Sequence, residues 1–228
     1  FGRHDIVEIL LKRGVQVDPI KRADWTPLML AVTKVGFDAQ KVVSILLTEG
    51  DADPTLRNKD GWNAFHLAAR EGDINILSLI FNSSPQSCQT VSKNGRTPAH
   101  TAALHGKLES LKFLLEKSTY SVNVTESCGA STLHEASRAC HINVVSYLIR
   151  SAGSNPLALD KMGRNCLSVA SHSGMKEVVV FLVEKIGMDV NTVSTNELKM
   201  AAVHWAAKEG HFETVRCLVE LKADANLK

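Results

Sequence analysis

The stretch that decides the fold is Asn94-Gly95-Arg96-Thr97-Pro98-Ala99-His100, which leads into Ala102-Ala103 and Gly106. The Asn-Gly pair is a tight-turn signal. Proline is favoured at the first position of a helix because the N–H it lacks would be unpaired there anyway. The two alanines allow close packing against a neighbour, and glycine ends a helix cheaply because it adopts a left-handed conformation. The stretch therefore predicts a turn, a short helix and a second turn in succession.

The same pattern recurs along the chain. Its third position falls at residues 28, 65, 99, 133, 167 and 203, in steps of 37, 34, 34, 34 and 36. An apolar stripe at helical spacing follows each short helix, and stacked helix pairs can bury such a stripe where one pair cannot. The matching strings are Thr26-Pro27-Leu28-Met29, Asn63-Ala64-Phe65-His66, Thr97-Pro98-Ala99-His100, Ser131-Thr132-Leu133-His134, Asn165-Cys166-Leu167-Ser168 and Ala201-Ala202-Val203-His204.

With these strings the chain resembles the ankyrin repeat family, whose signature is Thr-Pro-Leu-His-x-Ala at a period of about 33 residues. The resemblance covers the whole chain and implies an all-α ankyrin-repeat solenoid of stacked helix–turn–helix pairs with β-turn or hairpin tips. We expect residues 1–17 to supply the second helix of a truncated repeat, and residues 18–228 to form six repeats in one continuous solenoid. The family implies a protein-binding scaffold rather than an enzyme.

The two longer steps indicate insertions. About three extra residues fall around Val35–Gln40, and about two fall near Ser194–Met200. Insertions in repeat arrays map to loops, so we expect both to be loops. They are either loops that determine which partner binds or extra surface residues that the fold tolerates.

Composition and cysteine usage limit the function classes. The net charge is only +2, which favours neither nucleic acid nor a membrane surface as a partner. No apolar run approaches the roughly 20 residues that span a bilayer. Five cysteines form no C-x-x-C pair, so we expect free thiols in a reducing compartment, the cytoplasm and also the nucleus. We expect a monomer.

The histidines invite a metal-binding or catalytic interpretation, but their spacing favours a structural one. His134-Glu135 begins like the zinc-protease motif H-E-x-x-H, yet Arg138 stands where the second histidine belongs. No phosphate-binding glycine loop or G-x-S-x-G string is present. We therefore expect no catalytic residue, metal or cofactor. The resemblance implies that the signature histidines bond loop backbone and join neighbouring repeats; those near the inter-helix turn should cap or tie it. These two sets are His66, His100, His134 and His204, and His105, His141, His172 and His211.

The turn tips supply the candidate binding site. Tryptophan and arginine, which are enriched at interface hot spots, recur at equivalent tip positions. The alternative to partner binding is that each tryptophan packs on its neighbouring tip and that the charged side chains are only solvated. The predicted partner-binding residues are Arg22, Trp25, Lys59, Asp60, Trp62, Lys93 and Arg96, with Arg164 further along the chain.

A narrower resemblance rests on longer strings, among them Lys21-Arg22-Ala23-Asp24-Trp25-Thr26-Pro27-Leu28-Met29 and Asn58-Lys59-Asp60-Gly61-Trp62-Asn63. They are similar to the family of ankyrin repeat domain-containing protein 16. That resemblance implies a cofactor of alanyl-tRNA synthetase, which binds the synthetase's catalytic domain and captures misactivated serine on lysine side chains. A generic ankyrin adaptor for another protein partner is the alternative.

The same resemblance implies where the serine acceptors lie. Lys59 matches a family lysine in its full context, whereas Arg22 and Gln89 stand where two others are expected. Arginine stays protonated and cannot readily accept an acyl group. Lys21 and Lys93 lie close in sequence to those two positions, so the candidate serine acceptors are Lys59, Lys21 and Lys93.

Overall fold

The computed structural model describes residues 3–20, 22–34, 36–196 and 198–227. These residues form helices and turns; Thr125 and Ser131 make an isolated antiparallel bridge, and no strand is present in the described ranges. The chain divides into two compact units. Unit 1 comprises Phe1–Ala102 and Lys107–Tyr120, and unit 2 comprises Ala103–Gly106 and Ser121–Lys228.

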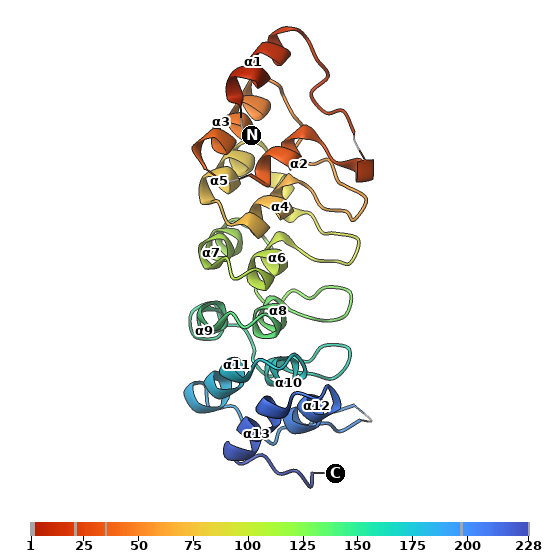
Figure 1. Cartoon of the computed structure of the whole chain (residues 1–228), viewed down its shortest axis with the longest axis vertical. Coiled ribbons are helices and arrows are strands. Elements are labelled where there is room, and N and C mark those ends of the chain that lie inside the picture. The colour runs from red at the N-terminus through yellow and green to blue at the C-terminus, as the bar shows by residue number, and fades with distance from the viewer. Residues whose placement is uncertain (1–2, 21, 35, 197, 228) are drawn as a thin grey trace. The chain divides into compact units, whose positions relative to one another are not determined.

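Each unit is a stack of helix pairs, in which the first helices form one layer and the second helices form another (Figure 1). The all-α repeat architecture predicted from the sequence is therefore confirmed, whereas the six-repeat array over residues 18–228 stays a prediction. Unit 1 holds α1 (His4–Lys12), the short η1 (Arg22–Asp24), α2 (Pro27–Val32), α3 (Phe37–Thr48), α4 (Ala64–Glu71), α5 (Ile74–Ser83), η2 (Pro85–Gln89), most of α6 (Pro98–Leu104) and α7 (Leu108–Lys117). Unit 2 holds α8 (Thr132–Arg138), α9 (Ile142–Arg150), α10 (Cys166–His172), α11 (Lys176–Val180), the π-helical η3 (Phe181–Lys185), α12 (Ala202–Lys208) and α13 (Phe212–Glu220).

The signature strings begin the first helices as expected. The side chain of Thr26 accepts a hydrogen bond from the Met29 N–H at 3.2 Å, and Pro27 follows as the first helical residue. Asn63 caps α4 in the same way, accepting from the His66 N–H at 3.1 Å. Such side chains satisfy N–H groups that a helix leaves unpaired in its first turn. The signature therefore sets both where each helix starts and which face it buries.

The apolar core lies between the layers and between successive repeats. The third signature position is buried in both units: Phe65 is 0% exposed, and Leu133 and Leu167 are each 1% exposed. Within unit 2, α10 packs between α8 and α12. The first helix α10 thus buries its apolar side chains partly against the first helices of the repeats on either side.

The insertion around Val35–Gln40 is helical, and the prediction of a loop there is wrong. When α3 and α5 are aligned at the usual repeat spacing of 34 residues, α3 starts three residues earlier than α5. Helix α3 starts at Phe37, and α5 starts at Ile74. Asp38 lies in this additional turn, where a negative charge is favourable near a helix N-terminus. The Lys41 ammonium lies 4.6 Å from the centre of the Phe37 ring, and the Gln40 side chain donates to Asp73 at 2.9 Å. Val35 itself lies outside the described residues.

The insertion near Ser194–Met200 widens a tip instead. Ser194 N–H donates to the Met200 carbonyl at 3.1 Å, and Ser194 Oγ accepts from the Met200 N–H at 3.0 Å. Ser92 and Arg96 make the same pair of bonds across a shorter tip. The extra residues therefore lie in a loop, as predicted, and leave the closing bonds unchanged; Glu197 lies outside the described residues.

The signature histidine joins neighbouring repeats. His66 is fully buried, and its Nε2 lies 3.0 Å from the carbonyl oxygen of Arg96 at the next tip. His134 makes the equivalent contact to Arg164 at 3.0 Å. A carbonyl oxygen only accepts, so Nε2 is the donor in both contacts. The expected structural role is confirmed for these two histidines.

A second set of histidines ties the turns between helices. His141 Nε2 lies 3.0 Å from the carbonyl oxygen of Leu104, so that the ring covers Gly106 of the preceding repeat. Gly106 has φ +68°, and a Cβ there would lie 2.5 Å from His141 Nδ1. Glycine is thus required for its left-handed backbone and for the space that the histidine fills. His211 repeats this arrangement over Gly174.

Cys140 shows what happens where that glycine is replaced. It occupies the same left-handed position, with φ 62°. The residue that follows Gly174 and begins the next second helix is Met175, where the other repeats of unit 2 have His141 and His211. A side chain at the glycine position and a histidine over it are mutually exclusive in this geometry. The two positions are therefore physically coupled across repeats.

The five cysteines are free thiols. Cys88 and Cys166 are buried, Cys128 is exposed, and Cys140 and Cys217 are half-buried. Burial raises the pKa of the Cys166 thiol to about 12. The buried pair therefore behaves as small apolar side chains.

Leu133→Ala and Leu167→Ala should each lower the free energy of unfolding by about 2–5 kcal/mol, because each removes a fully buried side chain and leaves a cavity. Leu157, which is 57% exposed, provides the matched control. Leu157→Ala should change stability by less than about 0.5 kcal/mol. Urea denaturation followed by circular dichroism measures all three. Equal losses at the buried and exposed positions would contradict the repeat register.

Stability should fall as the pH is lowered from 7.5 to 5. Burial lowers the pKa of His66 to about 4, with the Arg96 carbonyl opposing the shift, and burial also lowers the pKa of His134. The histidines of the unfolded chain have a pKa near 6.5, so they bind protons at a higher pH than the buried histidines of the folded chain do. The stability that depends on these neutral histidines is therefore fully present above about pH 6.5 and is lost as the pH falls toward the pKa of the folded state. His66 alone should contribute about 2 kcal/mol of loss by pH 5. The variant His66→Gln should show a correspondingly shallower pH dependence in urea titrations, and an unchanged slope would contradict the assignment.

Candidate functional site

The tips at Asn58 and Ser92 are each closed by a short side chain that accepts backbone hydrogen bonds. Asn58 is 6% exposed, and its Oδ1 accepts from the N–H groups of Asp60 at 3.0 Å and Trp62 at 2.9 Å. The Asn58 N–H also donates to the Trp62 carbonyl at 2.8 Å. These bonds fix a tight turn whose apex carries Lys59 and Asp60. The Gly61 N–H also donates to the Asn58 carbonyl, so the chain turns tightly at Asp60-Gly61.

Neighbouring tips are joined by one backbone hydrogen bond each. Lys59 N–H donates to the Ala23 carbonyl at 3.1 Å, and Lys93 N–H donates to the Asp60 carbonyl at 3.1 Å. The three tips of unit 1 therefore form a ladder, in which equivalent residues follow one another along one edge of the unit (Figure 1). The ladder holds Lys59 and Lys93 at equivalent points of successive turns.

The structure brings the predicted partner-binding residues together in unit 1. Arg22, Lys59, Asp60 and Lys93 are exposed, whereas Trp25, Trp62 and Arg96 are half-buried. Lys21, one of the three candidate serine acceptors, lies outside the described residues. We call the seven described residues the tip surface: Arg22, Trp25, Lys59, Asp60, Trp62, Lys93 and Arg96.

Trp62 has both a structural contact and an accessible face. Its ring stacks on the His66 ring, with centroids 6.0 Å apart and an angle of 24° between the planes. The residue remains half-buried. This contact lies within the repeat that carries Trp62, so it is not the packing on a neighbouring tip that the sequence offers as the alternative. A stacked, partly exposed indole is held in one orientation, which reduces the entropy cost of binding through it.

Arg164 in unit 2 is not an exposed side chain that a partner could contact freely, because it is paired and mostly covered. Its guanidinium binds the Asp160 carboxylate at 2.7 Å, and its side chain is only 16% exposed. The same group lies 5.6 Å from the centre of the buried Trp205 ring. Arg164 therefore stabilises its own tip.

The structure identifies Lys161 as a tip residue that the sequence analysis did not single out. Its N–H donates to the Cys128 carbonyl at 3.0 Å, as Lys93 does to Asp60. Lys161 is exposed. The spacing was a usable signal, because Lys59, Lys93, Ser127 and Lys161 follow one another in steps of 34 residues.

Gln89, which stands where the narrower resemblance expects a lysine, has a structural role. Its Oε1 accepts from the Thr119 hydroxyl at 2.8 Å, and its carbonyl accepts from the Tyr120 hydroxyl. It is half-buried at the end of η2. The position therefore holds a loop together rather than presenting an amine.

Among the described residues, no three His, Cys, Asp or Glu side chains are grouped so as to hold a metal ion. In that part of the chain no helix has both the length and the apolar character to cross a membrane.

Comparison with known proteins identifies the family. The model for ankyrin repeats in three copies matches residues 36–126 and 118–194, and the model for a single ankyrin repeat matches residues 200–228. The chain belongs to the ankyrin repeat family. It is also similar to an ankyrin repeat-containing protein of Schizosaccharomyces pombe, at 30% identity over 86 residues, which cover 37% of this chain and 36% of that protein. The match spans only about a third of the relative's length.

Ankyrin repeats are protein-binding scaffolds, and their stacking creates extended binding surfaces. Loops held on a rigid scaffold are common binding sites. The tip surface has this character, because buried side chains and backbone bonds fix its turns while charged groups project from them.

Asn58→Ala should loosen the tip that carries Lys59 and Trp62, because two part-buried backbone N–H groups lose their acceptor. We expect a loss of about 1–3 kcal/mol in the free energy of unfolding. Asn58→Asp is the matched control, since Asp160 accepts the equivalent pair of bonds in unit 2. The aspartate variant should retain most of the stability. Equal losses in both variants, measured by urea denaturation, would contradict the acceptor role.

Proposed function

We propose that the tip surface of unit 1 docks a protein partner, and that the partner is the catalytic domain of alanyl-tRNA synthetase. The observation that supports docking is the ladder itself, which holds two half-buried tryptophans beside exposed cations. The choice of partner rests on the narrower sequence resemblance. A generic ankyrin adaptor is the alternative, and it fits the same ladder equally well.

The composition of the tip surface indicates what the partner must offer. Arg22, Lys59 and Lys93 are exposed cations, and Asp60 is the exposed acid among them. A complementary surface therefore carries carboxylates around an apolar patch that receives the Trp62 indole. Large aromatic side chains in such patches supply much of the binding energy at interfaces.

Lys59 and Lys93 are the described lysines that we propose as serine acceptors. In the proposed step, a deprotonated ε-amine attacks the carbonyl carbon of seryl-adenylate. An amide bond forms to the lysine, the bond to the phosphate oxygen breaks, AMP leaves, and the amine loses a proton to water. Proximity to the adenylate supplies the rate, so no separate catalytic group is required. We place this activity in the cytoplasm, and also in the nucleus.

Two substitutions should separate docking from capture. Trp62→Ala should weaken binding to the purified catalytic domain by about 2 kcal/mol or more, the scale of an interface hot spot. Lys59→Arg keeps the charge but cannot accept the acyl group, so it should still bind while the seryl adduct at residue 59 disappears. Isothermal titration calorimetry measures binding, and mass spectrometry after incubation with synthetase, serine and ATP measures the adduct.

Matched controls make this test specific. Lys161→Glu changes the equivalent tip position in unit 2 and should leave binding intact, whereas Lys59→Glu should weaken it. Because Trp62 stacks on His66, the thermal midpoint of Trp62→Ala must show that the variant is folded. If the wild-type chain does not bind the synthetase, the generic adaptor stands. If it binds and neither Trp62→Ala nor Lys59→Glu weakens the complex, the tip surface is the wrong site.

A further inference from the structure

Lys59, Lys93 and Lys161 each occupy the apex of a tip and start from equivalent backbone positions. Each of them donates its backbone N–H to a carbonyl oxygen of the preceding tip. The pairs are Lys59 with Ala23, Lys93 with Asp60 and Lys161 with Cys128, at 3.1, 3.1 and 3.0 Å. The residue that follows the acceptor differs between the tips, and it is Asp24, Gly61 and Gly129 in turn. The three lysine side chains therefore leave the backbone over different surfaces.

Two of the lysine stems lie over a glycine. A Cβ on Gly61 would lie 2.6 Å from the backbone nitrogen of Lys93 and 3.3 Å from its Cγ. A Cβ on Gly129 would lie 2.8 Å from the backbone nitrogen of Lys161 and 3.1 Å from its Cγ. The first methylene groups of both lysines therefore pack on the turn of the preceding tip, and this packing requires a turn without a side chain.

The first tip carries a side chain at that position. Asp24 precedes Trp25 as Gly61 precedes Trp62. It keeps a left-handed backbone, with φ 62°, and Ala23 before it is left-handed too, with φ 66°. Such a backbone is uncommon for residues other than glycine, and Asp60, the counterpart of Ala23, does not adopt it. The first tip thus turns differently, because a Cβ placed as at Gly61 would collide with the backbone of the following tip.

The exposure of these residues agrees with this difference. Gly61 is buried where Lys93 crosses it, whereas Asp24 is exposed. Lys59 is exposed as well, and within the described tips no ion pair joins its ammonium group to Asp24 or Asp60. The side chain that distinguishes the first tip is therefore present at the surface beside a lysine that it does not bind.

We propose that Asp24 is a positioning residue that keeps the Lys59 side chain off the first tip, which makes Lys59 the apex lysine most readily modified by activated acyl groups. The Asp24 side chain fills the place that Gly61 leaves for the stem of Lys93. The Lys59 stem then extends into solvent, and its amine reaches an acyl carbon without first leaving a packed position. The inference rests on the proposed function only in naming seryl-adenylate as the natural acyl donor.

An acylating reagent tests this order in the whole folded chain without any partner. In N-hydroxysulfosuccinimide acetate, the carbonyl carbon of an activated ester is attacked by the deprotonated ε-amine. An amide bond forms, the N-hydroxysulfosuccinimide anion leaves, and the amine loses its proton to the buffer. With limiting reagent, peptide mass spectrometry gives the relative rate at each lysine. We expect Lys59 to react about threefold faster than Lys93 and Lys161, or more, the scale on which ordering a long side chain matters.

Two substitutions at residue 24 separate the shape of the side chain from its charge. Asp24→Gly lets the Lys59 stem pack on the turn, so the rate at Lys59 should fall to that of Lys93. Asp24→Asn removes the charge but keeps the side chain, and asparagine also tolerates a left-handed backbone. Fast labelling of Lys59 should therefore remain in this variant. Lys161 lies in unit 2 and should react at the same rate in all three proteins.

Three results would overturn the proposal. They are equal rates at Lys59 and Lys93 in the wild-type chain, an unchanged Lys59 rate in Asp24→Gly, and loss of fast labelling in Asp24→Asn, which would assign the effect to charge. Failure of the proposed function gives a different result. The labelling order would then hold, supporting the role of Asp24, while incubation with alanyl-tRNA synthetase, serine and ATP would leave no seryl adduct on Lys59.

Discussion

The ring of His66 lies fully buried in one repeat and reaches the Arg96 carbonyl at the tip of the next. This bond expresses the constraint on which the structure depends, namely that a repeat completes its core and its polar contacts only through a neighbour. A short first helix and one second helix cannot enclose an apolar stripe between them. The positions of tips, helices and turns are therefore fixed by contacts about one repeat apart in the sequence.

Several local features follow from that dependence. Gly106 carries no side chain because His141 of the next repeat fills the space where a Cβ would lie. Where Cys140 replaces the glycine, the histidine is absent as well. The buried carboxylate of Asp160 also has its partners. It accepts backbone hydrogen bonds that close its tip, and it holds the Arg164 guanidinium over the Trp205 ring. The repeat thus tolerates substitutions when the partner position changes with them.

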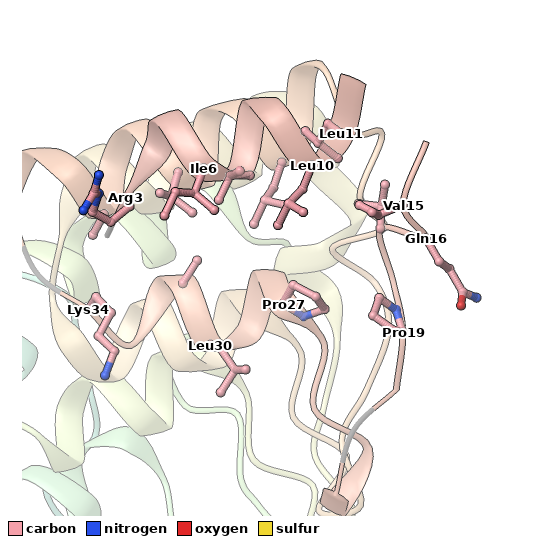
Figure 2. A pocket seen from close by; sticks show the side chains of 16 residues that line it. Arg3, Ile6, Leu10, Leu11, Val15, Gln16, Pro19, Pro27, Leu30 and Lys34 are labelled. Atoms are coloured by element: carbon pink, nitrogen blue, oxygen red, sulfur yellow. The ribbon is translucent and has the colours of Figure 1, made fainter. Parts of the chain in front are cut away.

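The chain offers two surfaces of different chemistry. The tip surface is charged, held by backbone bonds, and carries Trp62, whose ring is already oriented by stacking on His66. The groove between α1 and α2, in which Ile6 and Leu10 face Pro27 and Leu30, is apolar and resembles a cut through the core (Figure 2). A partner that carries carboxylates around an apolar patch suits the tip surface.

The sequence by itself determined the repeat, its helix starts and its buried positions. The physical reason is that helix-starting residues, left-handed glycines and apolar periodicity act through near neighbours, so the start of the helix at Pro27 and the burial of Leu133 follow from the sequence. It also predicted which residues stand at equivalent tips of unit 1. Only the tertiary structure decided how individual side chains are used, since those contacts join residues far apart in the sequence or depend on which geometry a segment adopts. The additional turn of α3, the engagement of Gln89 with Thr119, the opening of Leu30 and the pairing of Arg164 with Asp160 are of this kind.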